Sequence, residues 1–79
     1  MSERFTVRKF GDAVARYAQT VEHCETERQA RRVAAMLLKR KNLRGVPMWF
    51  DDFHGRTVYM PKGGHEFVTI RNNGKAVRR

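Results

Sequence analysis

The sequence predicts a single small α+β domain in which one amphipathic helix packs on a mainly antiparallel sheet. Two observations support this fold class. Apolar residues recur at helical spacing over one stretch, about residues 26–42. Short runs rich in β-branched and aromatic residues, separated by turn residues, lie on both sides of it. The 79 residues leave no room for a second core, so residues 1–79 are expected to form one ββαββ-like domain with an extra C-terminal strand or hairpin.

The predicted helix has matching signals at both ends. Thr26 and Gln29 form a T-x-x-Q capping box, in which the threonine side chain accepts a backbone N–H bond and Gln29 reaches back. Acidic residues stand near the start and basic residues near the end, as the helix dipole favours. Asn42 and Gly45 supply the stop. The side chains expected to face the sheet are Ala30, Val33, Ala34, Leu37 and Leu38.

Four strands are predicted from composition, namely Phe5–Phe10, Val46–Phe50, Arg56–Met60 and Phe67–Arg71. Pro47 lacks an N–H, so its strand is expected at an edge of the sheet or to start with the proline. Asn73 and Gly74 form a favoured hairpin turn. Residues 75–79 then either complete a hairpin or form a basic tail.

Residues 13–24 fit two interpretations. Four apolar residues at helical spacing, with Asp12 as a cap, are compatible with a helix. Its apolar face would lie about 180° out of phase with that of the next helix, so the two could not form one straight amphipathic rod. Alternatively, Tyr17–Cys24 is a strand that returns beside Phe5–Phe10 and leads into the helix. We favour the strand.

The net charge of +9, from 17 Lys and Arg against 8 Asp and Glu, favours a negatively charged partner. That partner is expected to be nucleic acid, DNA or RNA, or an acidic, nucleic-acid-handling protein complex. No run approaches the roughly 18 apolar residues of a membrane span, and the N-terminus lacks the apolar core of a signal peptide. Cys24 is the single cysteine and has no partner for an internal disulfide. We therefore expect a cytoplasmic protein without membrane contact.

The back of the predicted helix is basic. At about 100° per residue, Arg28, Arg32 and Lys39 fall opposite the apolar face, with Arg31 at the flank. This stripe is expected to contact phosphates, which gives affinity without sequence choice. No helix-turn-helix or other base-reading motif is present. The other basic residues expected to extend the stripe are Lys41, Arg44, Lys75, Arg78 and Arg79.

The aromatic residues Trp49, Phe50, Phe53 and Tyr59 lie close together around one predicted hairpin. Interleaved with basic residues, such a set can stack on the bases of single-stranded nucleic acid. More often, alternate members of the set form the core under the helix. We therefore expect Trp49 or Phe50 to be buried and Phe53, at the tip, to be the exposed candidate for binding.

No pattern in the sequence predicts an enzyme, a cofactor or a metal site. His23 and Cys24 are adjacent, so on a strand they point to opposite faces, and no C-x-x-C or H-x-x-x-H spacing is present. Asp51, Asp52 and His54 could resemble a nuclease site, but these residue types are also natural at a hairpin tip, which is the interpretation that we favour. The sequence therefore predicts a binding protein.

Three successive features form a recognisable pattern: a strand or hairpin, then T-x-x-x-A-x-x-x-A on a helix, then R-G-V-x-x-x-x-D-x-x-G-x-x-V-Y on a hairpin. This pattern resembles the ββαββ domains of small phage and bacterial proteins, in particular some anti-CRISPR proteins. The matching positions are Thr26, Ala30, Ala34, Arg44, Gly45, Val46, Asp51, Gly55, Val58 and Tyr59. The resemblance covers roughly the middle half of the chain, and the extension from Phe67 to Arg79 departs from the shortest such domains. It implies a non-enzymatic inhibitor that docks on a nucleic-acid-guided complex in the host cytoplasm, and it assigns no binding residue.

Overall fold

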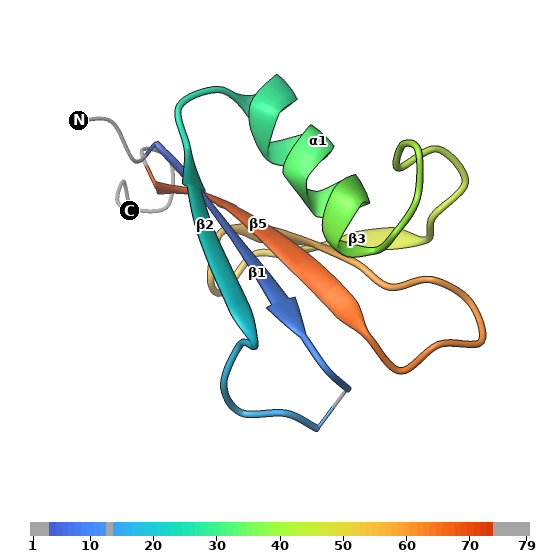
Figure 1. Ribbon diagram of the computed structural model, residues 1–79. Helices are drawn as coiled ribbons and strands as arrows, with labels where there is room; N and C mark the ends of the chain where they lie inside the picture. Colours follow the sequence, from blue (N-terminus) through green and yellow to red (C-terminus); the bar gives the residue numbers. More distant parts are fainter. Residues whose placement is uncertain (1–3, 13, 74–79) are drawn as a thin grey trace.

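The computed structural model describes residues 4–12 and 14–73, and in these residues five strands and one helix follow in the order β-β-α-β-β-β (Figure 1). The elements are β1 (Phe5–Phe10), β2 (Thr20–Cys24), α1 (Glu27–Leu37), β3 (Met48–Asp51), β4 (Arg56–Tyr59) and β5 (Phe67–Asn72). The strands form one sheet in the order β2-β1-β5-β4-β3, and every neighbouring pair is antiparallel. The predicted α+β class, with one helix and an extra C-terminal strand, is confirmed.

The first and last strands are neighbours at the centre of the sheet. Val7 of β1 pairs with Ile70 of β5, and the Asn73 N–H donates to the Arg4 carbonyl over 2.8 Å. β5 also pairs with β4, so it joins the N-terminal hairpin (β1 and β2) to the β3–β4 hairpin. The centre of the sheet therefore depends on pairs of residues that are 57 to 67 positions apart in the chain.

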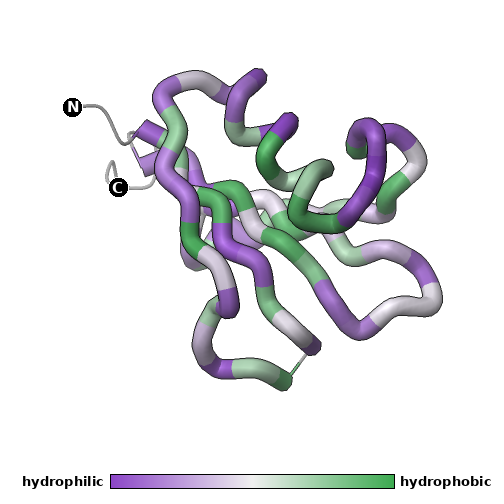
Figure 2. Tube along the Cα trace, viewed as in Figure 1, coloured by the Kyte–Doolittle hydropathy of each residue, from purple (hydrophilic) through white to green (hydrophobic). Residues whose placement is uncertain are grey.

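The core lies between α1 and the central strands. Val7 and Val68 of the sheet and Ala30 and Ala34 of the helix have no exposed surface. Figure 2 shows hydrophobic segments of the central strands beneath the helix. The helix packs on β1, β5 and β2, and β3 and β4 lie largely beyond its contact area. The small alanine side chains allow the helix axis to lie close to the strands.

The start of the helix was predicted correctly, whereas its end was not. The Thr26 hydroxyl accepts the Gln29 N–H over 3.1 Å, and the Gln29 side chain accepts the N–H of Glu25, one residue before the cap. The helix ends at Leu37, not near residue 42. Lys39 adopts a left-handed backbone (φ 61°), and its N–H and that of Arg40 donate to Met36 and Ala35, the Schellman pattern that closes a helix.

The ambiguous segment before the helix contains a strand, so the helical alternative is wrong. β2 covers Thr20–Cys24, three residues shorter at its start than the predicted strand. In the turn before it, the Asp12 carboxylate accepts the Val14 N–H over 2.9 Å. Of the two placements expected for the strand with Pro47, the edge of the sheet is the one observed, because β3 is an edge strand. It begins at Met48, one residue after the proline.

The expected burial of Trp49 or Phe50 is wrong. The two side chains are 49% and 58% exposed, because β3 lies at the sheet edge that α1 does not cover. Tyr59 on β4, one strand nearer the centre, is 5% exposed and joins the core. Phe53 is 87% exposed, as predicted. The β3–β4 hairpin therefore carries large apolar side chains that the fold does not bury.

Candidate functional site

Three of the predicted basic residues project together from α1. Arg28, Arg31 and Arg32 are related by three and four positions, the spacing that places side chains side by side on a helix. All three are exposed, because the opposite face, with Ala30 and Ala34, is packed on the sheet. The predicted division of the helix into an apolar face and a basic face is confirmed for these arginines.

The chain after the helix turns back and brings two more cations to the same place. The left-handed Lys39 ends the helix, and the buried Leu43 anchors the following loop in the core. The Asn42 carboxamide oxygen accepts the Arg44 N–H over 2.9 Å, which fixes a tight turn around Leu43. Lys41 and Arg44 therefore stay exposed on either side of a buried anchor.

The five cations line one groove of about 410 Å³ between the outer face of α1 and this loop. Its lining residues are Arg28, Arg31, Arg32, Ala35, Lys41, Asn42, Leu43 and Arg44. No acidic side chain is among them, and none of the five cations forms an ion pair with a residue that the structure describes. We call this feature the cationic groove. Guanidinium groups present several N–H donors in a fixed plane, which suits the bidentate binding of phosphate oxygens.

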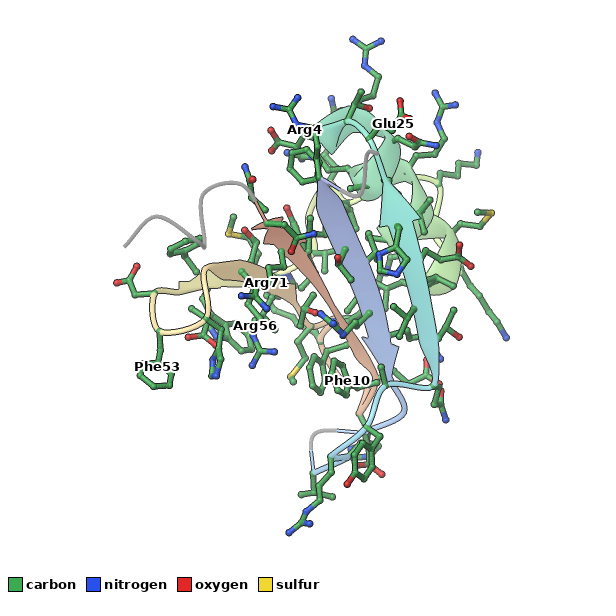
Figure 3. The ribbon with its side chains drawn as sticks, turned by 90° about the vertical axis from the view of Figure 1, so that its left-hand side faces the viewer. Arg4, Phe10, Glu25, Phe53, Arg56 and Arg71 are labelled. Carbon is green, nitrogen blue, oxygen red and sulfur yellow. The ribbon has the colours of Figure 1, made fainter. Side chains whose placement is uncertain are left out.

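The remaining predicted site residues are not brought to the groove. Lys39 lies in the turn after the helix and does not line the groove, which corrects its assignment to the helical stripe. Phe53 lies at the tip of the β3–β4 hairpin, where Figure 3 shows its ring pointing away from the sheet. Lys75, Arg78 and Arg79 lie outside the residues that the structure describes.

The face of the sheet opposite the helix carries a second group of arginines. Arg56 and Arg71 are paired across β4 and β5, and Figure 3 shows them close together on this face. The Asp51 carboxylate accepts a bond from Arg56 Nε over 3.0 Å, so part of this charge is neutralised. Arg71 Nε and the hydroxyl of the buried Thr69 have no hydrogen-bond partner among the described residues. Among the residues described at the cationic groove, none is a neutralising carboxylate of this kind.

Asp51 organises the tip of the β3–β4 hairpin. Its carboxylate accepts bonds from the N–H groups of Phe53 and His54, and from the His54 imidazole over 2.8 Å. These bonds, first that from the His54 side chain and then that from Arg56, hold the pKa of Asp51 below its usual value. The carboxylate is thus occupied by the hairpin itself. This geometry matches the structural role that the sequence suggested for the Asp51–His54 segment.

Cys24 is buried at the end of β2. Burial, with a smaller contribution from Glu22, raises the pKa of its thiol, which makes it a poor nucleophile. His23 points to the other face of the strand, where its ring lies 3.4 Å from the Thr6 hydroxyl. Among residues 4–12 and 14–73, no three His, Cys, Asp or Glu side chains are grouped so that they could hold a metal ion.

The chain matches no family model, and neither curated proteins nor solved structures gave a match. Within the described part of the chain, no helix has the length and apolar character needed to span a membrane.

The sequence predicted the basic residues of the groove but not the groove itself. Helical periodicity was sufficient to place Arg28, Arg31 and Arg32 on one face. The approach of Lys41 and Arg44 depends on the early end of the helix at Leu37, for which the sequence carries no glycine signal at Lys39. The buried Leu43 between two basic residues is the signal in the sequence that fits the observed loop.

Proposed function

We propose that this protein binds nucleic acid through the cationic groove. The observation that supports the proposal is the convergence of five cations from two segments, α1 and the loop after it, on one hollow that has no acidic residue among its described lining residues. Clustered like charges repel each other and reduce the stability of the fold. A polyanion in the groove relieves that repulsion and releases its own counterions, so the cluster favours binding to phosphates.

The expected mode is recognition of the phosphate backbone. Contacts of Lys and Arg with phosphates position a protein on nucleic acid but carry no sequence information. Binding should therefore vary little with sequence and weaken steeply as salt rises. The net charge of the whole chain, +9, would steer the encounter.

The test compares two triple variants of equal net charge. Arg28→Glu, Arg32→Glu and Arg44→Glu together reverse the groove, whereas Arg16→Glu, Arg40→Glu and Lys62→Glu reverse three exposed cations outside it. Each set lowers the net charge from +9 to +3. Fluorescence anisotropy with labelled DNA and RNA at several salt concentrations gives the affinity and its salt dependence.

The groove variant should lose most of its affinity and show a log–log salt slope shallower by about 2 to 3 units, since about three phosphate contacts are removed. The control variant should lose far less. Equal losses in both would mean that affinity follows net charge, which contradicts a specific groove. If the unmodified protein binds no nucleic acid and instead captures a protein complex after nuclease treatment, the alternative applies, an anti-CRISPR-like inhibitor that docks on a host nucleic-acid-handling complex.

A further inference from the structure

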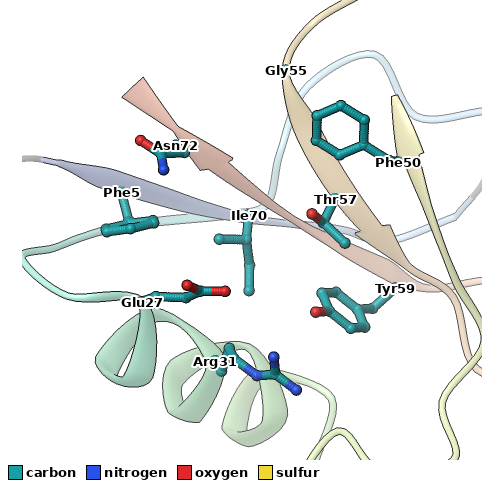
Figure 4. A pocket seen from close by; sticks show the side chains of 9 residues that line it. All are labelled: Phe5, Glu27, Arg31, Phe50, Gly55, Thr57, Tyr59, Ile70 and Asn72. Carbon is teal, nitrogen blue, oxygen red and sulfur yellow. The ribbon is translucent and has the colours of Figure 1, made fainter. Parts of the chain in front are cut away.

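A cavity of about 170 Å³ lies next to the cationic groove, between the first turns of α1 and the β3–β4 hairpin (Figure 4). It exists because α1 covers β2, β1 and β5 and leaves the inner side of the hairpin open. Phe50 and Thr57 are paired across β3 and β4 and share this side with Tyr59. Glu27 and Arg31 close the cavity from the helix.

The cavity combines aromatic walls with hydrogen-bond donors and hydrogen-bond acceptors. Phe50 and Tyr59 contribute rings, and in Figure 4 the hydroxyls of Thr57 and Tyr59 point toward the centre. Glu27 provides a carboxylate that accepts hydrogen bonds, and Arg31 provides a guanidinium that donates them. A flat heterocycle with a polar edge satisfies both requirements, because its face stacks on the rings and its edge has donors and acceptors.

The size of the cavity suits a single ring. An apolar cavity of about 150 Å³ in another protein accommodates benzene. The present cavity is slightly larger, about 170 Å³, and it is open on one side. A pyrimidine ring therefore fits within it, and the rest of a nucleotide can leave through the open side.

Arg31 connects the cavity to the groove, because its side chain lines both. A strand with its phosphates along the groove would thus carry a base past the mouth of the cavity. A base in a duplex is stacked and paired, and it reaches such a pocket only at the cost of being flipped out. An unpaired base reaches it without that cost.

We propose that this cavity binds one unpaired nucleobase of a single strand whose phosphates lie in the cationic groove. The inference rests on the proposed function, and it adds that single strands are preferred to duplexes. Charge complementarity between the groove and a phosphate chain favours this occupant over an aromatic side chain from a protein.

Phe50 and Trp49 provide a matched pair of variants. They are neighbours on β3 with similar exposure, yet they point to opposite faces of the sheet, and only Phe50 lines the cavity. Because both side chains are about half exposed, Phe50→Ala and Trp49→Ala should leave the core intact, which circular dichroism checks. Affinities are measured by anisotropy for a short oligodeoxycytidine, a duplex of the same length, and an abasic strand with the same number of phosphates.

The unmodified protein should bind the base-bearing strand more tightly than the duplex or the abasic strand. Phe50→Ala should weaken binding of the base-bearing strand by about five- to 150-fold, the effect of losing one stacked base, and leave binding of the abasic strand unchanged. Trp49→Ala should leave both affinities unchanged. Equal binding of base-bearing and abasic strands, or equal effects of the two variants, would overturn the proposal.

The triple groove variant separates this inference from the proposed function. If the groove variant binds none of the three probes and Phe50→Ala has no effect on binding, phosphate binding in the groove is supported and base binding in the cavity is refuted. That result is also the one expected if the cavity instead accepts an aromatic side chain of a protein partner. Absence of binding to any strand by the unmodified protein at low salt would refute both.

Discussion

The two halves of the sheet differ in what covers them. On β1 and β5, Val7 and Val68 are fully buried beneath α1, whereas Met48 and Phe50 on β3 are more than half exposed. A helix is about 10 Å across and strands lie about 4.8 Å apart, so one helix covers two or three strands of the five. The covered half supplies most of the core, and the uncovered hairpin retains exposed apolar side chains.

The largest expected contrast between the halves is in stability. Val68→Ala removes two methyl groups from the fully buried centre of β5 and should lower the free energy of unfolding by about 2 to 3 kcal/mol. Met48→Ala on β3 truncates a larger but exposed side chain and should cost within about 0.5 kcal/mol. Urea denaturation measures both. Similar losses would show that the hairpin contributes to the core as much as the central strands do.

Amide hydrogen exchange should show the same difference in stability between the two halves of the sheet without a mutation. Amides of β1 and β5 lie in central strands with neighbours on both sides, so they should exchange only when the domain unfolds. Amides of the β3–β4 hairpin should exchange at least about tenfold faster through local opening, because α1 does not hold that hairpin in place. Uniform protection across the sheet would mean that the two halves open as one unit.

A variant of Lys39 shows whether the proposed binding surface extends beyond the cationic groove. Its left-handed backbone suits glycine, so Lys39→Gly should raise the free energy of unfolding by about 0.5 to 1 kcal/mol. Lys39 does not line the cationic groove, so nucleic-acid affinity should fall only slightly, as expected for one distant charge. Thermal denaturation and anisotropy measure the two effects. A large loss of affinity would restore Lys39 to the binding site.

The smallest expected effect is a pH dependence confined to the uncovered hairpin. Because the pKa of Asp51 is lowered in the folded state, its stabilising contribution is complete above the unfolded value of about 3.9 and is lost as pH falls through the folded value. The stability difference between the unmodified protein and Asp51→Asn should therefore shrink below about pH 4. Asp52→Asn removes an exposed neighbouring carboxylate and provides the control. A difference that does not change between pH 6 and pH 3 would contradict this role of Asp51.

Local signals in the sequence were sufficient for most of the fold. The run Phe5–Phe10 ends at a Gly-Asp turn, and its predicted bounds match β1. The capping residue Thr26 was identified because its side-chain oxygen acts within one turn of the chain. The helix end was missed because Lys39 adopts a conformation that its residue type disfavours, which only the tertiary structure stabilises.

The candidate site was predictable only in part, for a related reason. The three arginines of α1 follow from helical geometry, which is local. The exposure of Trp49 and Phe50 depends on the position of β3 at the edge and on how far the helix reaches. Alternation along a strand defines two faces, but it does not tell which face the helix covers. The sequence alone therefore does not predict the cavity.

The pairing of the first strand with the last has a consequence for how the chain acquires its structure. The β1–β2 and β3–β4 hairpins are local, but only β5 connects them into one sheet. Contacts between residues far apart in sequence form late and slow folding, since the intervening loop must close first. During synthesis, the N-terminal hairpin and α1 emerge while the sheet still lacks its central strand. A ribosome-bound chain that ends before Phe67 would then leave exposed the part of the apolar underside of α1 that β5 covers, and it would be a substrate for chaperones.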